Sequence, residues 1–195
     1  MGGGWLHHLY ISNYGRGLIL NLAIDALMYL KTQGIDLRRP FLDELIALAE
    51  KDERICFITM DVGFSFLEDF QKRFPDRFFN FGVTEQSSMI IAATMALSGL
   101  RPVIYSMINF VTFRVHEMVR NAVCLHKAPV LIAGVKGSEK YRFLGFSHNL
   151  IRENEEIDFL EKLPGMKCYL PKSEEETQKA VKKIFLENNP AYIRL

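Results

Sequence analysis

The sequence is poor in cysteine, and the few cysteines show no pattern typical of a site. Cys56, Cys124 and Cys168 are far apart, odd in number and form no C-x-x-C pair. Cys56 and Cys168 each lie in an apolar, strand-like run. This usage favours buried, reduced thiols in a cytoplasmic protein. Neither the cysteines nor any helix with paired histidines argues for a protein-bound zinc site.

Net charge and long apolar runs are also scarce. The formal net charge is +1, which gives no reason to expect nucleic acid or an anionic membrane as a partner. The most apolar stretch, Leu18–Leu30, contains Asn21 and Asp25 and is too short to span a bilayer. It also lacks the features of a signal peptide, so we expect a protein without a membrane-bound segment.

The chain is predicted to contain one domain, over residues 40–195, after a tail and an appended helix in residues 1–39. The appended helix covers Leu18–Leu30 and ends at Gly34; it either packs on the domain or docks on another subunit. With 195 residues and 49% apolar residues, the chain can form a sizeable core.

Apolar strands alternate with helical segments throughout the domain. This alternation predicts a three-layer α/β/α fold with a mainly parallel sheet. We expect strands over 54–60, 78–81, 102–106, 129–135, 166–170 and 191–195. We expect helices over 40–49, 66–74, 85–98, 113–126, 157–163 and 173–187, the last with a capping box of Ser173 and Glu176. Residues 136–149 lack clear periodicity and are predicted as a long loop.

Chemically useful side chains follow several of these strands. Asp61, Glu85, the loop after Ser106 and the loop after Val135 all come at carboxyl ends. Ligands of open α/β sheets bind outside that edge, so these positions predict a single crevice.

Glu85 stands where an apolar strand gives way to a helix. Thr84 is expected to cap that helix through its hydroxyl, and Gly99 with Pro102 marks its end. A carboxylate at such a turn is a candidate for proton chemistry. The alternative is an acid that only satisfies the helix dipole.

Several segments, in order, resemble the pyrimidine-binding domain of transketolase-like thiamine diphosphate (ThDP) enzymes. This family includes transketolase, deoxyxylulose-phosphate synthase and the β chain of 2-oxoacid dehydrogenases. Phe74–Gln86 is similar to the family's RFPDRFFNVGIAEQ run and Leu97–Val103 to its LAGLRPV step. Leu163–Met166 and Pro190–Leu195 also match, and the similarity runs from Phe41 to Leu195.

The resemblance implies a role for three residues around the cofactor's pyrimidine. Glu85 hydrogen-bonds N1′ of the ring and favours the imino tautomer, which takes up the C2 proton of the thiazolium. Phe110, in a loop similar to FLNFVSY, stacks on the pyrimidine. Phe113 matches an aromatic residue that lines the same pocket, with a core position as the alternative.

Two further residues are implied to be close to the reaction. Asp61 matches an aspartate at a strand end near the cofactor and the dimer contact, although it could simply cap the strand. His148 matches a histidine that faces the reacting carbon and serves substrate binding or proton transfer. An exposed loop histidine is the alternative there.

The sequence also departs from the family. Leu144 replaces an acidic residue that would hydrogen-bond a sugar hydroxyl, so an ordinary ketose phosphate is not a safe substrate prediction. Lys136, Lys140 and Arg142 could meet a phosphate or carboxylate in the same loop, or form a solvated loop face.

The family's diphosphate site, a GDG motif followed by an Asn ligand of Mg²⁺, has no counterpart in these residues. We therefore expect one subunit of a split ThDP-dependent transferase, active only with a diphosphate-binding partner that carries Mg²⁺, as a homodimer or heterotetramer. The substrate would be a small ketose or 2-oxoacid. Alternatives are a β-type component of a 2-oxoacid dehydrogenase, or a catalytically silent structural or regulatory relative.

Overall fold

Six parallel strands form one sheet in the part of the chain that the computed structural model describes, residues 36–137 and 139–195. Their order across the sheet is β2-β1-β3-β4-β6-β5, and every pairing is parallel. All six carboxyl ends therefore lie along the same edge. The strands are β1 (Ile55–Thr59), β2 (Phe78–Asn80), β3 (Arg101–Met107), β4 (Leu131–Val135), β5 (Lys167–Tyr169) and β6 (Ala191–Arg194).

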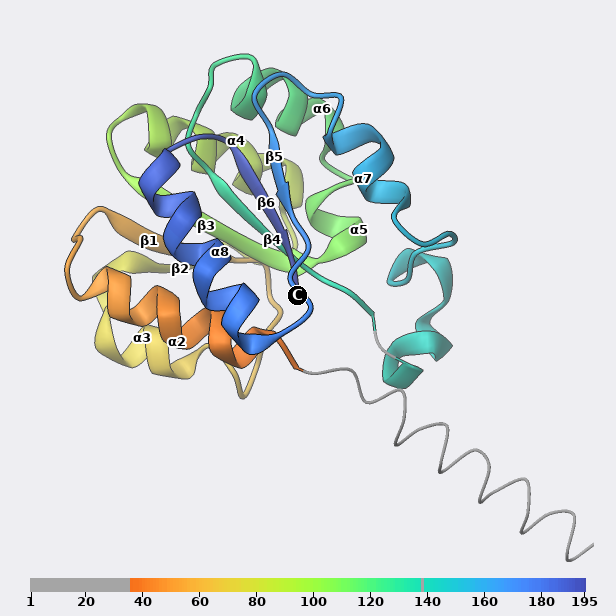
Figure 1. Ribbon diagram of the computed structural model, residues 1–195, viewed down its shortest axis with the longest axis horizontal. Helices are drawn as coiled ribbons and strands as arrows, with labels where there is room; N and C mark the ends of the chain where they lie inside the picture. Colours follow the sequence, from red (N-terminus) through yellow and green to blue (C-terminus); the bar gives the residue numbers. More distant parts are fainter. Residues whose placement is uncertain (1–35, 138) are drawn as a thin grey trace, which may run out of the picture. The chain divides into compact units, whose positions relative to one another are not determined.

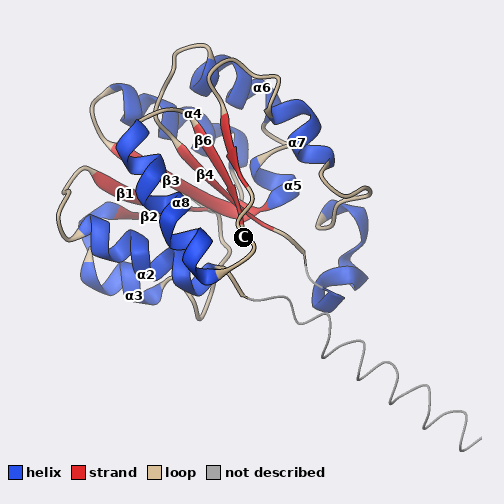
Figure 2. Ribbon diagram, in the orientation of Figure 1, coloured by secondary structure: helices blue, strands red, loops and turns tan. Residues whose placement is uncertain are grey.

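Helices cover both faces of this sheet (Figures 1 and 2). One layer consists of α2 (Arg38–Ala49), α3 (Glu68–Arg73) and α8 (Glu174–Glu187). The other consists of α4 (Glu85–Leu97), α5 (Ile108–Val111), α6 (His116–Met118) and α7 (Glu155–Leu160). The predicted three-layer α/β/α fold is thus confirmed. The appended helix predicted over Leu18–Leu30 lies outside the described residues.

Alternate residues of each central strand belong to separate apolar cores. In β3, Val103 and Tyr105 pack with α2, α3 and α8, whereas Ile104 packs with the opposite layer. In β6, Ala191 and Ile193 face the first core and Tyr192 the second. A strand that is buried on both faces reads as a continuous apolar run, which explains why these strands could be predicted within about two residues.

Two predicted segments differ from the structure. The helix expected over 113–126 begins three residues later than predicted, and a separate short helix, α5, precedes it; α5 ends at Val111, where the hydroxyl of Thr112 donates to the carbonyl of Ile108 at 2.7 Å. Helical structure resumes at His116 and continues as a π-helical turn, Val119–Cys124. Apolar spacing does not reveal such a break, because a β-branched residue that bonds back to its own helix leaves the spacing unchanged. The loop predicted over 136–149 contains 3₁₀ turns, Glu139–Ser147, interrupted where Gly145 takes a φ of 67°.

The three cysteines carry free thiols in the described chain. Cys56 and Cys124 are buried, and burial raises the pKa of the Cys56 thiol to about 12 and that of Cys124 to about 11. Among the described residues we find no helix with the length and apolarity that a membrane span requires.

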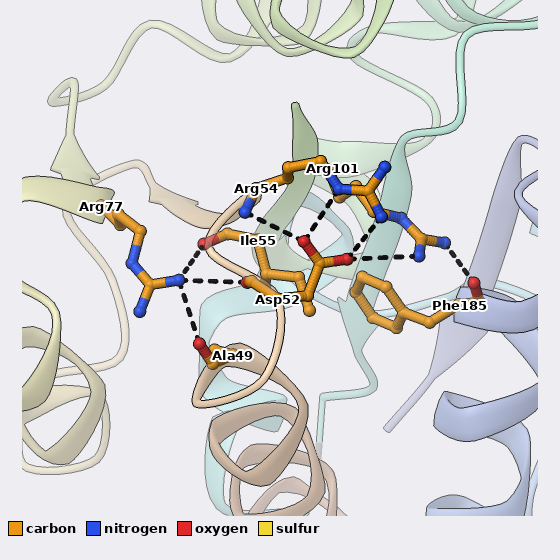
Figure 3. A network of polar contacts seen from close by, with 7 residues as sticks. All are labelled: Ala49, Asp52, Arg54, Ile55, Arg77, Arg101 and Phe185. Atoms are coloured by element: carbon orange, nitrogen blue, oxygen red, sulfur yellow. Dashed lines mark hydrogen bonds and ion pairs between the residues drawn. The ribbon is translucent and has the colours of Figure 1, made fainter. Parts of the chain in front are cut away.

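A polar network around Asp52 joins α8 and the end of α2 to the amino-terminal edge of the sheet (Figure 3). Arg54 donates from Nε and Nη2 to the Asp52 carboxylate, at 2.9 and 2.8 Å. Arg101, at the start of β3, lies 3.7 Å from the same carboxylate and donates to the carbonyl of Phe185 in α8. Arg77 Nη1 donates to the carbonyls of Ala49 and Asp52, at 3.1 and 3.2 Å. The hydrogen bond with Arg54 is the main reason why the pKa of Asp52 falls from its ordinary 3.8 to about 2.

We predict that Asp52→Asn destabilises the fold in a pH-dependent way. The pKa of Asp52 is lower in the folded state, so its carboxylate stabilises the fold above about pH 4, and this contribution is lost as the pH falls towards 2. After allowance for solvent screening we expect a loss of about 1 kcal/mol at pH 7. Urea unfolding of both proteins between pH 7 and the acid limit of folding measures it. The surface variant Asp158→Asn is the control, and a difference that does not shrink at low pH would contradict the prediction.

Candidate functional site

The carboxyl edge of the sheet brings the predicted site segments to one side. Asp61 follows β1, Glu85 begins the helix after β2, Phe110 lies in the helix after β3, and His148 lies in the long connection after β4. Because β2, β1, β3 and β4 are consecutive neighbours in a parallel sheet, these four connections leave the same edge side by side.

Glu85 is a buried acid at the first position of α4, with 6% of its surface exposed. The predicted cap is wrong: the Thr84 hydroxyl makes no capping bond and instead donates to the carbonyl of Phe81 at 2.9 Å. The same oxygen lies 3.1 Å from Ser88 Oγ of α4, so Thr84 contacts a helix side chain and not the amides of the first turn. The helix does end as predicted at Gly99, which adopts a φ of 97°.

Arg114 is the partner of Glu85 and was not identified from the sequence. Its Nη1 lies 2.5 Å from Glu85 Oε1. The carbon at the centre of the same guanidinium lies 4.1 Å from the centroid of the Phe110 ring. The Arg114 side chain is 42% exposed, whereas that of Glu85 is 7% exposed. The guanidinium thus links a buried carboxylate to an aromatic face. The sequence shows a basic residue four positions after Phe110, but that residue is far from Glu85 in the sequence, so no local pattern predicts that the two side chains pair.

The backbone of Arg114 is held independently of its side chain. Its N–H donates to the carbonyl of Asn109 at 3.0 Å. Its carbonyl accepts a bond from Nε2 of Gln86, the second residue of α4, at 3.2 Å. These two bonds anchor the segment between α5 and α6 to α5, through Asn109, and to α4, through Gln86.

His148 also contacts Phe110. The two rings meet nearly edge to face, with centroids 4.8 Å apart and an interplanar angle of 73°. Ser147 Oγ donates to the carbonyl of Leu144 at 3.0 Å and lies 2.8 Å from His148 Nδ1. A hydroxyl has a single proton, so Nδ1 must be the donor to this oxygen. In the neutral imidazole that tautomer leaves the lone pair on Nε2, which can accept a proton.

Asn109 holds the connection that carries His148. Its Nδ2 donates to the carbonyls of Phe146 and Asn149, at 2.7 and 3.3 Å. These carbonyls lie on either side of His148 in the sequence. Asn109 directly precedes Phe110, so one side chain fixes the histidine connection against the helix that presents the aromatic ring.

Asp61 and Phe113 make contacts with other residues. Asp61 is exposed and adopts a φ of 57°, a conformation that Asp tolerates better than most residues. The side chain of Asn80 joins two strand ends, because its Oδ1 accepts bonds from the N–H groups of Asp61 and Gly82, each at 3.0 Å. Phe113 packs on Phe159 of α7, with centroids 5.1 Å apart. Their roles at a cofactor remain predictions.

The contacts around Glu85 are those that an aminopyrimidine needs. Such a ring requires a buried carboxylate at a ring nitrogen and an aromatic face to stack on. Glu85 and Phe110 offer both, and a planar N–H-bearing group already bridges them. The residues present therefore fit the pyrimidine of ThDP. The described residues contain no group of three or more His, Cys, Asp or Glu side chains that could hold a metal ion.

Comparison with known sequences identifies the family. The profile described as "Transketolase, pyrimidine binding domain" matches residues 33–195. The chain is 38% identical over 153 residues to the 1-deoxy-D-xylulose-5-phosphate synthase of Listeria monocytogenes, covering 75% of this chain and 24% of that enzyme. It is 33% identical over 159 residues to a subunit of the apulose-4-phosphate transketolase of Phocaeicola vulgatus, covering 81% of this chain and 50% of that protein.

Comparison with solved structures gives the same fold. A structure described as "Split gene transketolase, inactive beta4 tetramer" superposes with a TM-score of 0.73 at 32% identity, covering 83% of this chain and 52% of that chain. A transketolase from Leishmania mexicana shares the fold, with a TM-score of 0.67 at 17% identity, over 80% of this chain and 24% of that one. The chain thus spans between a quarter and a half of these relatives' lengths. It belongs to the family of transketolase pyrimidine-binding domains.

Proposed function

We propose that this chain supplies the pyrimidine half of a ThDP-dependent active site and, with a diphosphate-binding partner, catalyses transfer of a two-carbon ketol unit. The observation that carries the proposal is the juxtaposition of the buried Glu85 carboxylate and the Phe110 ring, bridged by a planar cation. ThDP, when bound, supplies the carbon nucleophile of the reaction.

Each residue of the site has a role in this proposal. Glu85 holds or releases a proton at the pyrimidine N1′, and its burial excludes water from that exchange. Phe110 stacks on the ring and sets its plane. His148 accepts or donates a proton through Nε2, because Nδ1 is engaged by Ser147. Asp61 and Phe113 would line the entrance to the cofactor.

The diphosphate and Mg²⁺ would be held by a partner chain. Two relatives support this arrangement: one is named as a subunit of an apulose-4-phosphate transketolase, and the other is a split-gene transketolase. The outer face of α4 also suits a partner. Ile90, Ile91 and Leu97 are 46%, 39% and 57% exposed on this helix, and Glu85 is its one charged residue. A homodimer or heterotetramer would cover this face. The buried free thiols support a cytoplasmic location.

One prediction concerns Glu85→Gln, which keeps the size of the side chain but cannot exchange a proton. Mixed with a diphosphate-binding chain of a split transketolase, ThDP and Mg²⁺, the variant should lose ~10²-fold or more of its ketol-transfer rate. The matched control is Glu175→Gln, an exposed acid paired with Lys179 on α8, which should keep the wild-type rate.

Three results of that assay would decide between the alternatives. Unchanged transfer by Glu85→Gln would exclude the proposed role of the carboxylate. Turnover of pyruvate but of no ketose would assign the chain to a 2-oxoacid decarboxylating component. ThDP binding that Glu85→Gln leaves intact, with no turnover of any ketose or 2-oxoacid, would identify a catalytically silent relative.

Another prediction concerns Asn109→Ala, which should lower the transfer rate by about tenfold while ThDP affinity changes by less than about threefold. The carbonyls of Phe146 and Asn149 lose their donor, which destabilises the ordered conformation of the connection that carries His148 by about 1–3 kcal/mol. Hydrogen exchange of residues 145–149 should rise in parallel. Unchanged exchange, or a loss of rate explained entirely by weaker ThDP binding, would contradict the role of Asn109 as a positioning residue.

A further inference from the structure

We infer that Arg114 is a built-in occupant of the pyrimidine position, and that the cofactor must displace its guanidinium in order to bind. This inference rests on the proposed function of the Glu85–Phe110 site. It assigns to Arg114 the control of cofactor affinity, a role distinct from the chemistry of Glu85.

The guanidinium makes the same pair of contacts that the pyrimidine would make. It is flat, carries N–H groups, lies 2.5 Å from the Glu85 carboxylate and covers the Phe110 ring at 4.1 Å. Both contacts use the planar fork of arginine, which stacks on aromatic faces and pairs with carboxylates. On this inference the pyrimidine uses the same Glu85 oxygen and the same face of Phe110 as the guanidinium, so binding of one excludes the other.

The charges explain why the position is filled. Glu85 is buried, and a buried carboxylate without a partner is strongly disfavoured. Arg114 neutralises it within the same chain. Arg114 is 42% exposed, and its backbone is anchored by Asn109 and Gln86, so the side chain can swing into solvent while the segment stays in place. The contact is therefore a closed state that can open without unfolding the site.

Competition of this kind lowers the apparent affinity in a defined way. If only a fraction of the molecules has Arg114 swung out, the apparent Kd rises by the inverse of that fraction. Removing the guanidinium should restore the lost affinity. In a protein that already lacks the carboxylate, removing the guanidinium should bring no gain, because without Glu85 nothing holds Arg114 in the site.

The experiment measures binding by calorimetry with two probes. Thiamine, which carries the pyrimidine without the diphosphate, is titrated into the isolated full chain; ThDP with Mg²⁺ is titrated into the chain mixed with its diphosphate-binding partner. Arg114→Gln should bind both probes about tenfold more tightly than the wild type. The control is Arg152→Gln, which removes the same charge from an exposed pair with Asp158 and should change neither affinity by more than about twofold.

The opposite charges of the probes separate displacement from general electrostatics. Loss of a positive charge alone would weaken binding of anionic ThDP and favour cationic thiamine, whereas displacement strengthens both. In a Glu85→Gln background, Arg114→Gln should give no further gain. Arg114→Lys, a second variant that keeps the charge but lacks the planar fork, should fall between wild type and Arg114→Gln.

Equal or weaker binding of both probes by Arg114→Gln and Arg114→Lys, with Glu85→Gln still reducing ThDP binding, would overturn the inference and leave the proposed function standing. Failure of every protein, wild type included, to bind either probe would overturn both.

Discussion

Parallel strand pairing is the constraint on which the rest of this structure depends. Thr59 at the end of β1 lies level with Asn80 of β2 and Tyr105 of β3, and β3 runs on until Met107 pairs with Val135 of β4. The strands therefore end at different levels along this edge. Because β3 extends past the end of β1, α5, which carries Phe110, starts beyond the end of β1 and opposite the start of α4. Residues that are far apart in the sequence meet there because every strand points the same way.

A second constraint is the burial of Glu85 at that edge. A carboxylate removed from water needs a partner that supplies charge or hydrogen bonds. The chain supplies one from the next strand-to-helix connection in the sequence, through a segment whose backbone is tied to α4 and α5. The four residues between α5 and α6 are a turn, and within it the Arg114 N–H and carbonyl bond to Asn109 and Gln86 while its side chain pairs with Glu85.

The fold was predictable because its strands are buried on both faces and read as apolar runs without alternation. The capped start of α8 was predictable too, since Ser173 Oγ accepts the Glu176 N–H through a purely local contact. The site was predictable only in part. Glu85 was a candidate from its position at a strand-to-helix turn, Phe110 and His148 were candidates only through the family resemblance, and strand order brings their connections to one edge. Arg114, Asn80 and Asn109 were missed, because their functions depend on contacts across connections that no local pattern records. Thr84 shows the converse: a residue type that suits a cap was engaged by a neighbouring carbonyl instead.

The exchange inferred for Arg114 has a consequence for assembly under the proposed function. Within this chain, the guanidinium and a pyrimidine would compete for the Glu85 carboxylate and the Phe110 ring, and each competitor would make similar contacts with them. Burial by a partner would strengthen either pairing by the same physical effect, the lower dielectric around Glu85. The choice between them must therefore come from contacts that only one competitor makes. A cofactor has a diphosphate to offer to a second chain, whereas Arg114 has nothing beyond this site. The partner would thus decide which group occupies the position, and cofactor capture would be coupled to subunit assembly.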